Sequence, residues 1–353
     1  MKIILDKFDS ARVEQLAAVL ATNSRVIDAL SDFVNNFSTF ISPDMLNEIT
    51  QNCNMPPAEA YAILAASACG LQTDVNQDDN SIYNNYFKPG FICCNPADYI
   101  ADRFYRLIGN QPAVFGNWQL KMLEYAPCQA FVCGQSELTA DFVEIPHIGF
   151  FTKSFSFPCV MRNSREWMAV KPNEIITMQN PLRNTHGNVL VYGLGIGYFA
   201  CNAAFKESVN KVTVIENDNQ AVELFNSRIR PLFKESEKID IVIDDAFEYA
   251  EKIAPDNNFD YVFADIWHDT LDGFHIYLKL KRLEYLQTQA KFDYWIEDSI
   301  LGRLRGFVFD QIYKIFKTAD NSHVRDKEIV ITDYNGFINL LSNNTLKNFN
   351  VNN

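Results

Sequence analysis

The chain has 353 residues, 48% of them hydrophobic and 21% charged, so it is long enough for more than one domain and apolar enough for a buried core. Its net charge of −13 argues against a broad nucleic-acid-binding surface, because phosphate binding needs a basic patch. The first residues lack the apolar region of a signal peptide, and the longest apolar run, from Ala60, is too short to span a bilayer. We expect a cytoplasmic protein without nucleic-acid or membrane partners.

Helical spacing dominates the N-terminal region. In residues 9–37 apolar side chains recur at intervals of three and four, which predicts a long helix. Residues 55–71 predict another helix, with Pro57 in its first turn and Gly70 at its end. The polar residues 72–84 predict a loop. We therefore assign residues 1–127 to a mainly helical domain.

A β-rich segment follows. Residues 142–170 are rich in Phe, Val and Ile, are interrupted by Pro146, Gly149 and Pro158, and contain a turn at 162–166, which predicts a small antiparallel sheet. Residues 171–182 predict a short helix. We assign residues 128–180 to this β-rich segment and a connector, and a homodimer through it is one arrangement that the sequence allows.

Strand and helix patterns alternate after residue 188. Apolar β-type runs occur at 189–193, 211–215, 239–243, 259–264 and 292–296, with helical segments between them. Strands that are regularly separated by helices pair in parallel. Residues 181–353 are therefore expected to form a Rossmann-like, doubly wound and mostly parallel α/β domain.

The first of these strands runs into the glycine turn Gly193-Leu194-Gly195-Ile196-Gly197. Glycines between a strand and a helix allow a ligand to approach the backbone closely. A dinucleotide fingerprint, G-x-G-x-x-G, would need glycine where this chain has Tyr198, which counts against NAD. We expect Gly193, Leu194, Gly195 and Gly197 to contact a different cofactor.

Acidic residues follow the second and third strands. Glu216, with Asn217 beside it, follows the second strand, where a carboxylate can accept hydrogen bonds from both ribose hydroxyls of a nucleoside. Asp244 and Asp245 follow the third strand, where either can bind an adenine amino group. Asp245 can also cap the helix that begins at Ala246.

At this point residues 188–300 resemble a class I S-adenosylmethionine (SAM)-dependent methyltransferase domain. The resemblance implies that the cofactor is S-adenosyl-L-methionine and that the turn at 193–197 lies against its methionine portion. It also implies that Glu216 holds the ribose and that Asp245 and Ala246 contact adenine. Within this superfamily the chain looks most like the spermidine synthase-like branch, which also has a β-rich segment before the nucleotide domain.

That branch uses an Asp after the fourth strand to activate an amine, and Asp265 occupies this place. The match departs from the branch just beyond Asp265, where Ile266 to Asp269 replace the usual acid and proline residues. The identity of the substrate therefore does not carry over.

Asp265 is the first candidate for holding or deprotonating a nucleophile, although cofactor binding is an alternative role. His268 is a second candidate base, or else a surface histidine. Trp267 and Asp269 are candidate substrate contacts in an acidic pocket for an amine, with Trp267 as a cation–π wall or, alternatively, as a core residue. The sequence around them lacks established metal-ligand geometry, and no metal is expected.

The sequence thus predicts a SAM-dependent methyltransferase that acts on a small molecule, with amines among the candidate acceptors. The first alternative is a spermidine synthase-like aminopropyltransferase that uses decarboxylated SAM. The second is a non-catalytic SAM-binding module.

Overall fold

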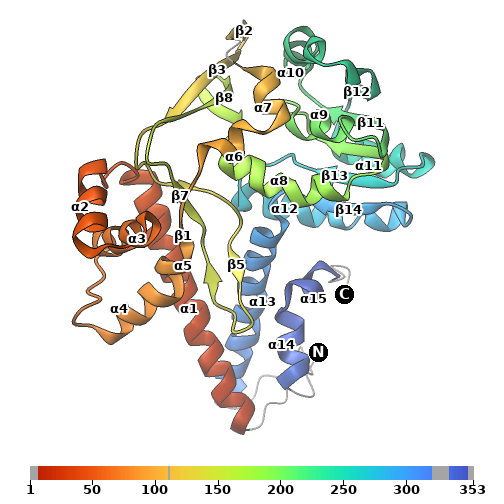
Figure 1. Cartoon of the computed structure of the whole chain (residues 1–353). Helices are drawn as coiled ribbons and strands as arrows, with labels where there is room; N and C mark the ends of the chain where they lie inside the picture. Colours follow the sequence, from red (N-terminus) through yellow and green to blue (C-terminus); the bar gives the residue numbers. More distant parts are fainter. Residues whose placement is uncertain (1–6, 110–111, 320–333, 349–353) are drawn as a thin grey trace.

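A computed structural model describes residues 7–109, 112–319 and 334–348 of the chain. Figure 1 shows helices α1 to α5 in red and orange at the lower left, with α6 and α7 higher up near α9, and the parallel sheet with its helices in green and cyan at the upper right. The β-rich segment lies between these two parts and reaches up beside the parallel sheet.

The N-terminal part is mainly helical, as the apolar spacing predicts. Its polar residues 72–84 do not form only a loop, because a helix begins after Asn76, whose side chain accepts hydrogen bonds from the N–H groups of Asp78 and Asp79. The elements are α1 (Lys7–Asn36), α2 (Pro43–Cys53), α3 (Pro57–Ala68), α4 (Gln77–Ile82), the π-helical turn η1 (Tyr83–Phe87), α5 (Lys88–Gly90), α6 (Pro96–Ile100) and α7 (Arg103–Ile108).

The expected antiparallel sheet has the order β2-β3-β8-β9. Strands β8 and β9 come from the β-rich segment at 128–180, whereas β2 and β3 precede residue 128. Its turn between β8 and β9 lies at Asn163 and Ser164, which both have positive φ. Two further sheets are separate from it. Strand β7 lies between β1 and β4 in one, and β5 pairs with β6 in the other. The strands are β1 (Phe91–Cys93), β2 (Ala113–Phe115), β3 (Trp118–Tyr125), β4 (Phe131–Val132), β5 (Glu137–Leu138), β6 (Glu144–Ile145), β7 (Ile148–Phe150), β8 (Phe155–Arg162) and β9 (Arg165–Ala169).

The α/β part contains a parallel sheet, which among the described residues has the order β12-β11-β10-β13-β14. This confirms the predicted fold class. The chain moves outward from β10 to β12 and then returns to the other side at β13, so the switch point lies between β10 and β13, where ligands of open α/β sheets bind. The strands are β10 (Gly187–Tyr192), β11 (Val209–Glu216), β12 (Ile239–Ile243), β13 (Tyr261–Ala264) and β14 (Lys291–Tyr294).

Helical segments precede and separate these strands, as the alternating pattern predicts. They are α8 (Pro172–Asn184), α9 (Tyr198–Ala204), α10 (Asn219–Leu224), η2 (Phe225–Ile229), η3 (Arg230–Leu232), η4 (Lys234–Lys238), α11 (Ala246–Lys252), η5 (Ala254–Asp256), α12 (Thr270–Lys281) and η6 (Glu284–Gln287).

The C-terminal helices α13 (Glu297–Ala319), α14 (Tyr334–Leu341) and α15 (Asn343–Lys347) join the two parts. Helix α13 leaves the sheet and packs beside α1 (Figure 1), where Val13 and Ile312 belong to one small core. The buried Arg305 of α13 binds Glu144 and donates to the backbone oxygen of Leu341 at 3.1 Å. In the described part of the chain, no helix combines the length and the apolar character needed to cross a membrane.

Candidate active site at the carboxyl edge of the parallel sheet

The glycine turn leaves β10 at the switch point. Gly193, Gly195 and Gly197 have φ values of 96°, 53° and 84°, which favour glycine. A Cβ atom at Gly193 would lie 2.1 Å from the backbone oxygen of Asp265, and one at Gly195 would lie 2.1 Å from Met168 Sδ. The missing side chains therefore make room for atoms of the protein itself, and ligand contact by this turn stays a prediction.

Glu216, at the end of β11, is bound to this turn. Its carboxylate accepts hydrogen bonds from the N–H groups of Leu194 at 3.0 Å and Asp218 at 2.9 Å. These two bonds leave acceptor capacity on the carboxylate, and the side chain is only partly buried. Asn217 is exposed beside it. Glu216 thus holds the turn in place and still has oxygen lone pairs for a ribose.

The acids after β12 have local partners. Asp245 caps α11, because its side chain accepts hydrogen bonds from the N–H groups of Phe247 and Glu248. Asp244 accepts from the N–H of Asp245 at 2.8 Å, and Ala246 is the first residue of α11. Helix capping therefore accounts for Asp245 without a ligand, and the adenine contacts stay predictions.

Asp265, directly after β13, differs from these acids. Its backbone N–H donates to Tyr192 at 2.9 Å, which sets it beside the glycine turn. Its carboxyl group has no hydrogen-bond or ion-pair partner among the described residues. Burial, together with the nearby carboxylate of Glu174, raises the pKa of Asp265 well above its usual value. A partly exposed acid that has a raised pKa and no protein partner is a candidate for binding or deprotonating a ligand.

Glu174 is a further candidate site residue, which was not predicted from the sequence. It lies in the first turn of α8 and is 8% exposed, and burial raises its pKa to about 7. Its ionised form also raises the pKa of Asp265, so the two carboxyl groups act on each other electrostatically. A glutamate next to the apolar residues Ile175 and Met178 on one helix face was the available signal.

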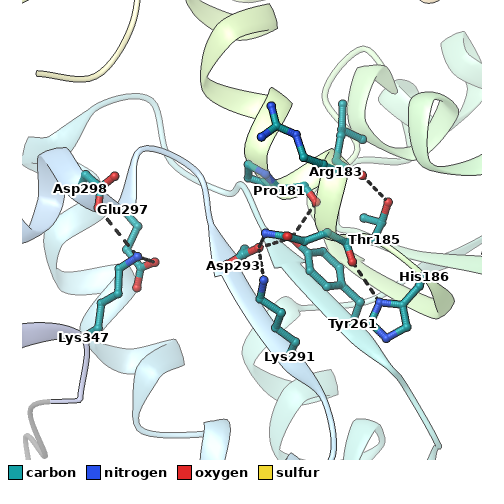
Figure 2. A network of polar contacts seen from close by, with 12 residues as sticks. Pro181, Arg183, Thr185, His186, Tyr261, Lys291, Asp293, Glu297, Asp298 and Lys347 are labelled. Atoms are coloured by element: carbon teal, nitrogen blue, oxygen red, sulfur yellow. Dashed lines mark hydrogen bonds and ion pairs between the residues drawn. The ribbon is translucent and has the colours of Figure 1, made fainter. Parts of the chain in front are cut away.

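Helix α8 is attached firmly to the sheet, which fixes Glu174. At its far end, the single O–H of Tyr261 of β13 is shared between two acceptors, the backbone oxygen of Pro181 at 3.0 Å and the carboxylate of Asp293 at 2.5 Å (Figure 2). Nearer to Glu174, the indole N–H of Trp295 donates to the hydroxyl of Thr177 at 3.0 Å. These contacts link α8 to β13 and to the residue after β14.

The loop after Asp265 is largely explained by its own packing. Trp267 is 5% exposed and its ring lies 6.4 Å from that of Tyr294, so it is a core residue and presents no open ring face for a cation. Asp269 caps α12 and forms a capping box with Asp272. His268 is exposed, with Nδ1 3.6 Å from Asp272 and its ring 4.4 Å from that of Trp167. The predicted substrate and catalytic roles of these residues stay predictions.

Acids also follow β14. Lys347 of α15 forms ion pairs with Glu297 and Asp298 (Figure 2), and Tyr277 donates to Glu297 at 2.9 Å. These contacts hold the C-terminal helix against the end of β14.

Across residues 7–109, 112–319 and 334–348, no three His, Cys, Asp or Glu side chains gather as metal ligands.

The fold is Rossmann-like and of the class I methyltransferase type. Its parallel sheet has a glycine turn at the switch point and an acid after each of β11, β12 and β13. Residues 173–277 match the family model described as the spermine/spermidine synthase domain. The matched part runs from Glu174 through the glycine turn and Asp265 to α12. It confirms the predicted resemblance to the spermidine synthase-like branch for this part of the chain.

Solved structures of spermidine synthases are also similar to the chain. The enzyme from Thermotoga maritima shares 16% identity over 53% of this chain and 65% of its own, with a TM-score of 0.30. A spermidine synthase in complex with the transition state analogue AdoDATO shares 17% identity over 53% of this chain and 66% of its own, with a TM-score of 0.32. The chain thus covers less than two thirds of either enzyme, and at these scores the likeness adds no argument. A search among curated proteins gives no match.

The family match corrects the predicted function. The expectation of a methyltransferase is wrong, because the matched family is that of spermine and spermidine synthases, which favours the aminopropyltransferase alternative. The coarser expectation of a transferase agrees with the match. The error has a physical origin. Both reactions start from a sulfonium nucleoside, and Glu216 and Asp245 were predicted to contact only the nucleoside part that the two reactions share.

Proposed function

We propose that this protein is an aminopropyltransferase of the spermidine synthase type, which transfers the aminopropyl group of decarboxylated SAM to a small amine. The observation that carries the proposal is Asp265, a partly buried carboxyl group beside the glycine turn, which has a raised pKa and no protein partner among the described residues. The match of residues 173–277 to the synthase family supports it.

The residues at the edge of the sheet suit the nucleoside part of such a substrate. Glu216 is partly exposed and has free lone pairs for the two ribose hydroxyls. Asp244 is partly exposed at the end of β12, one strand further from the switch point, where an adenine amino group would need an acceptor. These residues would therefore bind the nucleoside and orient it.

The carboxyl groups of Asp265 and Glu174 suit the amine. A protonated amine that enters this acidic region would restore a charge partner to Asp265 and lower its pKa. Before it can attack, the amine must lose a proton, and a carboxylate whose pKa is raised above its usual value, as that of Asp265 is, is a better acceptor for that proton. Asp265 would thus first hold the amine and then accept its proton.

The atoms and charges of the transfer balance without a further reactant. The amine nitrogen forms a bond to the propyl carbon next to the sulfonium, and the carbon–sulfur bond breaks. The electron pair of that bond stays on sulfur, which becomes the neutral thioether of methylthioadenosine. The proton of the amine passes to the carboxylate of Asp265 and then to solvent, so positioning and proton transfer are the tasks left to the protein.

The test is an assay of the full chain with decarboxylated SAM and a panel of diamines and polyamines. Mass spectrometry would follow methylthioadenosine and the aminopropylated amine, and parallel reactions would contain SAM. We expect both products with decarboxylated SAM only. Nucleoside binding without product from any amine would favour the non-catalytic binding module and would overturn the proposal.

A further inference from the structure

Met168 of β9 lies directly on the glycine turn. Its Sδ accepts a hydrogen bond from the N–H of Ile196 at 3.2 Å. The same sulfur would lie 2.1 Å from a Cβ atom at Gly195, so the absence of a side chain there is what admits it. The thioether therefore covers the middle of the turn, at the switch point of the sheet.

The β8–β9 hairpin holds Met168 in this position from both sides. On one side, Arg162 of β8 forms an ion pair of 2.9 Å with Asp218, after β11. On the other, the ring of Trp167 meets that of His268, after β13, at 4.4 Å. The hairpin thus crosses the ends of three neighbouring strands, and Met168 lies over the middle one.

The turn consequently has few free N–H groups that could bind an anion. Backbone N–H groups in glycine turns are common anion donors. Four of the five N–H groups of this turn already donate within the protein: that of Gly193 to Ile215, that of Leu194 to Glu216, that of Ile196 to Met168 and that of Gly197 to Leu194. Among the described contacts, only the N–H of Gly195 has no acceptor.

Negatively charged side chains near the turn also disfavour an anion there. Glu216 accepts a hydrogen bond from Leu194, and the backbone oxygen of Asp265 lies against Gly193, so two acidic residues contact the first two residues of the turn. A carboxylate that approached the turn would meet acidic neighbours and a covered amide, whereas an ammonium group would be attracted.

We propose that Met168 is a specificity-determining residue, which excludes a nucleoside ligand with a carboxylate on its tail and admits one whose tail carries only an amine. This inference rests on the proposed function and deepens it. It assigns the discrimination between SAM and decarboxylated SAM to one side chain that covers the N–H of Ile196.

A matched pair of ligands tests the inference. S-adenosylhomocysteine and its decarboxylated form differ only in the carboxylate, and neither can transfer a group. Calorimetric titration of the full chain should show a preference of at least about tenfold for the decarboxylated ligand. Met168→Ala should remove most of that preference, because it opens the space and frees the amide. Met168→Leu should retain it, because the volume over the turn is kept.

Each outcome bears on a distinct claim. If the unaltered chain binds both ligands equally, or Met168→Ala retains the preference, the role of Met168 is wrong while nucleoside binding stands. If the unaltered chain binds neither ligand nor methylthioadenosine, the proposed function fails and this inference fails with it.

Two further variants keep the test decisive. Met168→Val suits a strand and is too short to reach Ile196, so it replaces the alanine variant should that one not fold. Met122→Ala, on β3 of the same antiparallel sheet, is the control and should leave the preference unchanged.

Discussion

The two sides of the glycine turn use the same residue types in opposite ways. On the side of β11 and β12, Glu216 and Asp245 each accept hydrogen bonds from two backbone N–H groups. On the side of β13, Asp265 has no such partner within the described ranges, and Glu174 is buried beside it. All four are acids near one edge of one sheet.

The difference separates two roles of an acid at a strand end, a structural one and a ligand-binding one. A carboxylate that is hydrogen-bonded to backbone amides is stable in its charged form and fixes local structure. A buried carboxyl group without a partner lowers stability in its charged form, and such groups concentrate at functional sites. We therefore expect substitutions on the β13 side to change activity and pH dependence, and those on the other side to change stability.

The largest effect is expected for Asp265→Asn. Loss of the group that we propose to hold and deprotonate the amine should lower kcat/KM by about 10²–10⁴-fold. The thermal stability should not fall, because a neutral amide avoids the cost of burying a charge. Steady-state kinetics and thermal unfolding measure the two effects, with the exposed Asp74→Asn as control. Activity within threefold of the unaltered chain would remove Asp265 from the chemistry.

Glu174 should make stability depend on pH. Its pKa is raised from 4.5 to about 7 by folding, so the folded chain binds more protons than the unfolded chain between these values. The free energy of unfolding should therefore fall as the pH rises from about 4.5 to about 7, by up to about 3 kcal/mol.

Glu174→Gln should flatten this dependence and leave the chain relatively more stable above pH 7. Urea unfolding between pH 4.5 and 8 measures the slope, with the exposed Glu207→Gln as control. An unchanged slope in the Glu174 variant would show that this carboxyl group is not protonated in the folded chain.

Glu216→Ala should destabilise the fold and weaken nucleoside binding together. It leaves the N–H groups of Leu194 and Asp218 without their acceptor, which costs about 1–3 kcal/mol. Chemical unfolding and titration with methylthioadenosine measure the two losses. Full stability in this variant would show that the turn holds itself without Glu216.

Asp245 should have the smallest effect, limited to stability. Asp245→Ala removes the cap of α11 and should cost about 1 kcal/mol, whereas Asp245→Asn should retain most of the stability because Asn caps equally well. Thermal unfolding of both variants measures this difference. Equal losses in the two variants would contradict the capping role.

Much of the carboxyl edge of the parallel sheet can be predicted from local sequence. The strands of the parallel sheet were predicted to within three residues at each end, and the acids after them were placed correctly, because apolar runs and turn glycines depend on neighbouring residues. The roles of Asp245 and Asp269 were harder to predict, since a capping acid and a ligand-binding acid occupy the same place at a strand end. Only the hydrogen bonds in the structure distinguish a capping acid from a ligand-binding acid.

The sequence by itself determined the parallel sheet, the glycine turn at its switch point and the presence of Asp265 after β13. The tertiary structure alone decided that Glu174 from α8 lies near Asp265 and that Met168 from β9 covers the turn. Periodicity reports which face of a segment is buried, but the partner it meets depends on how helices and hairpins pack across the sheet. Those contacts join residues 28 to 91 positions apart, and no local pattern encodes them.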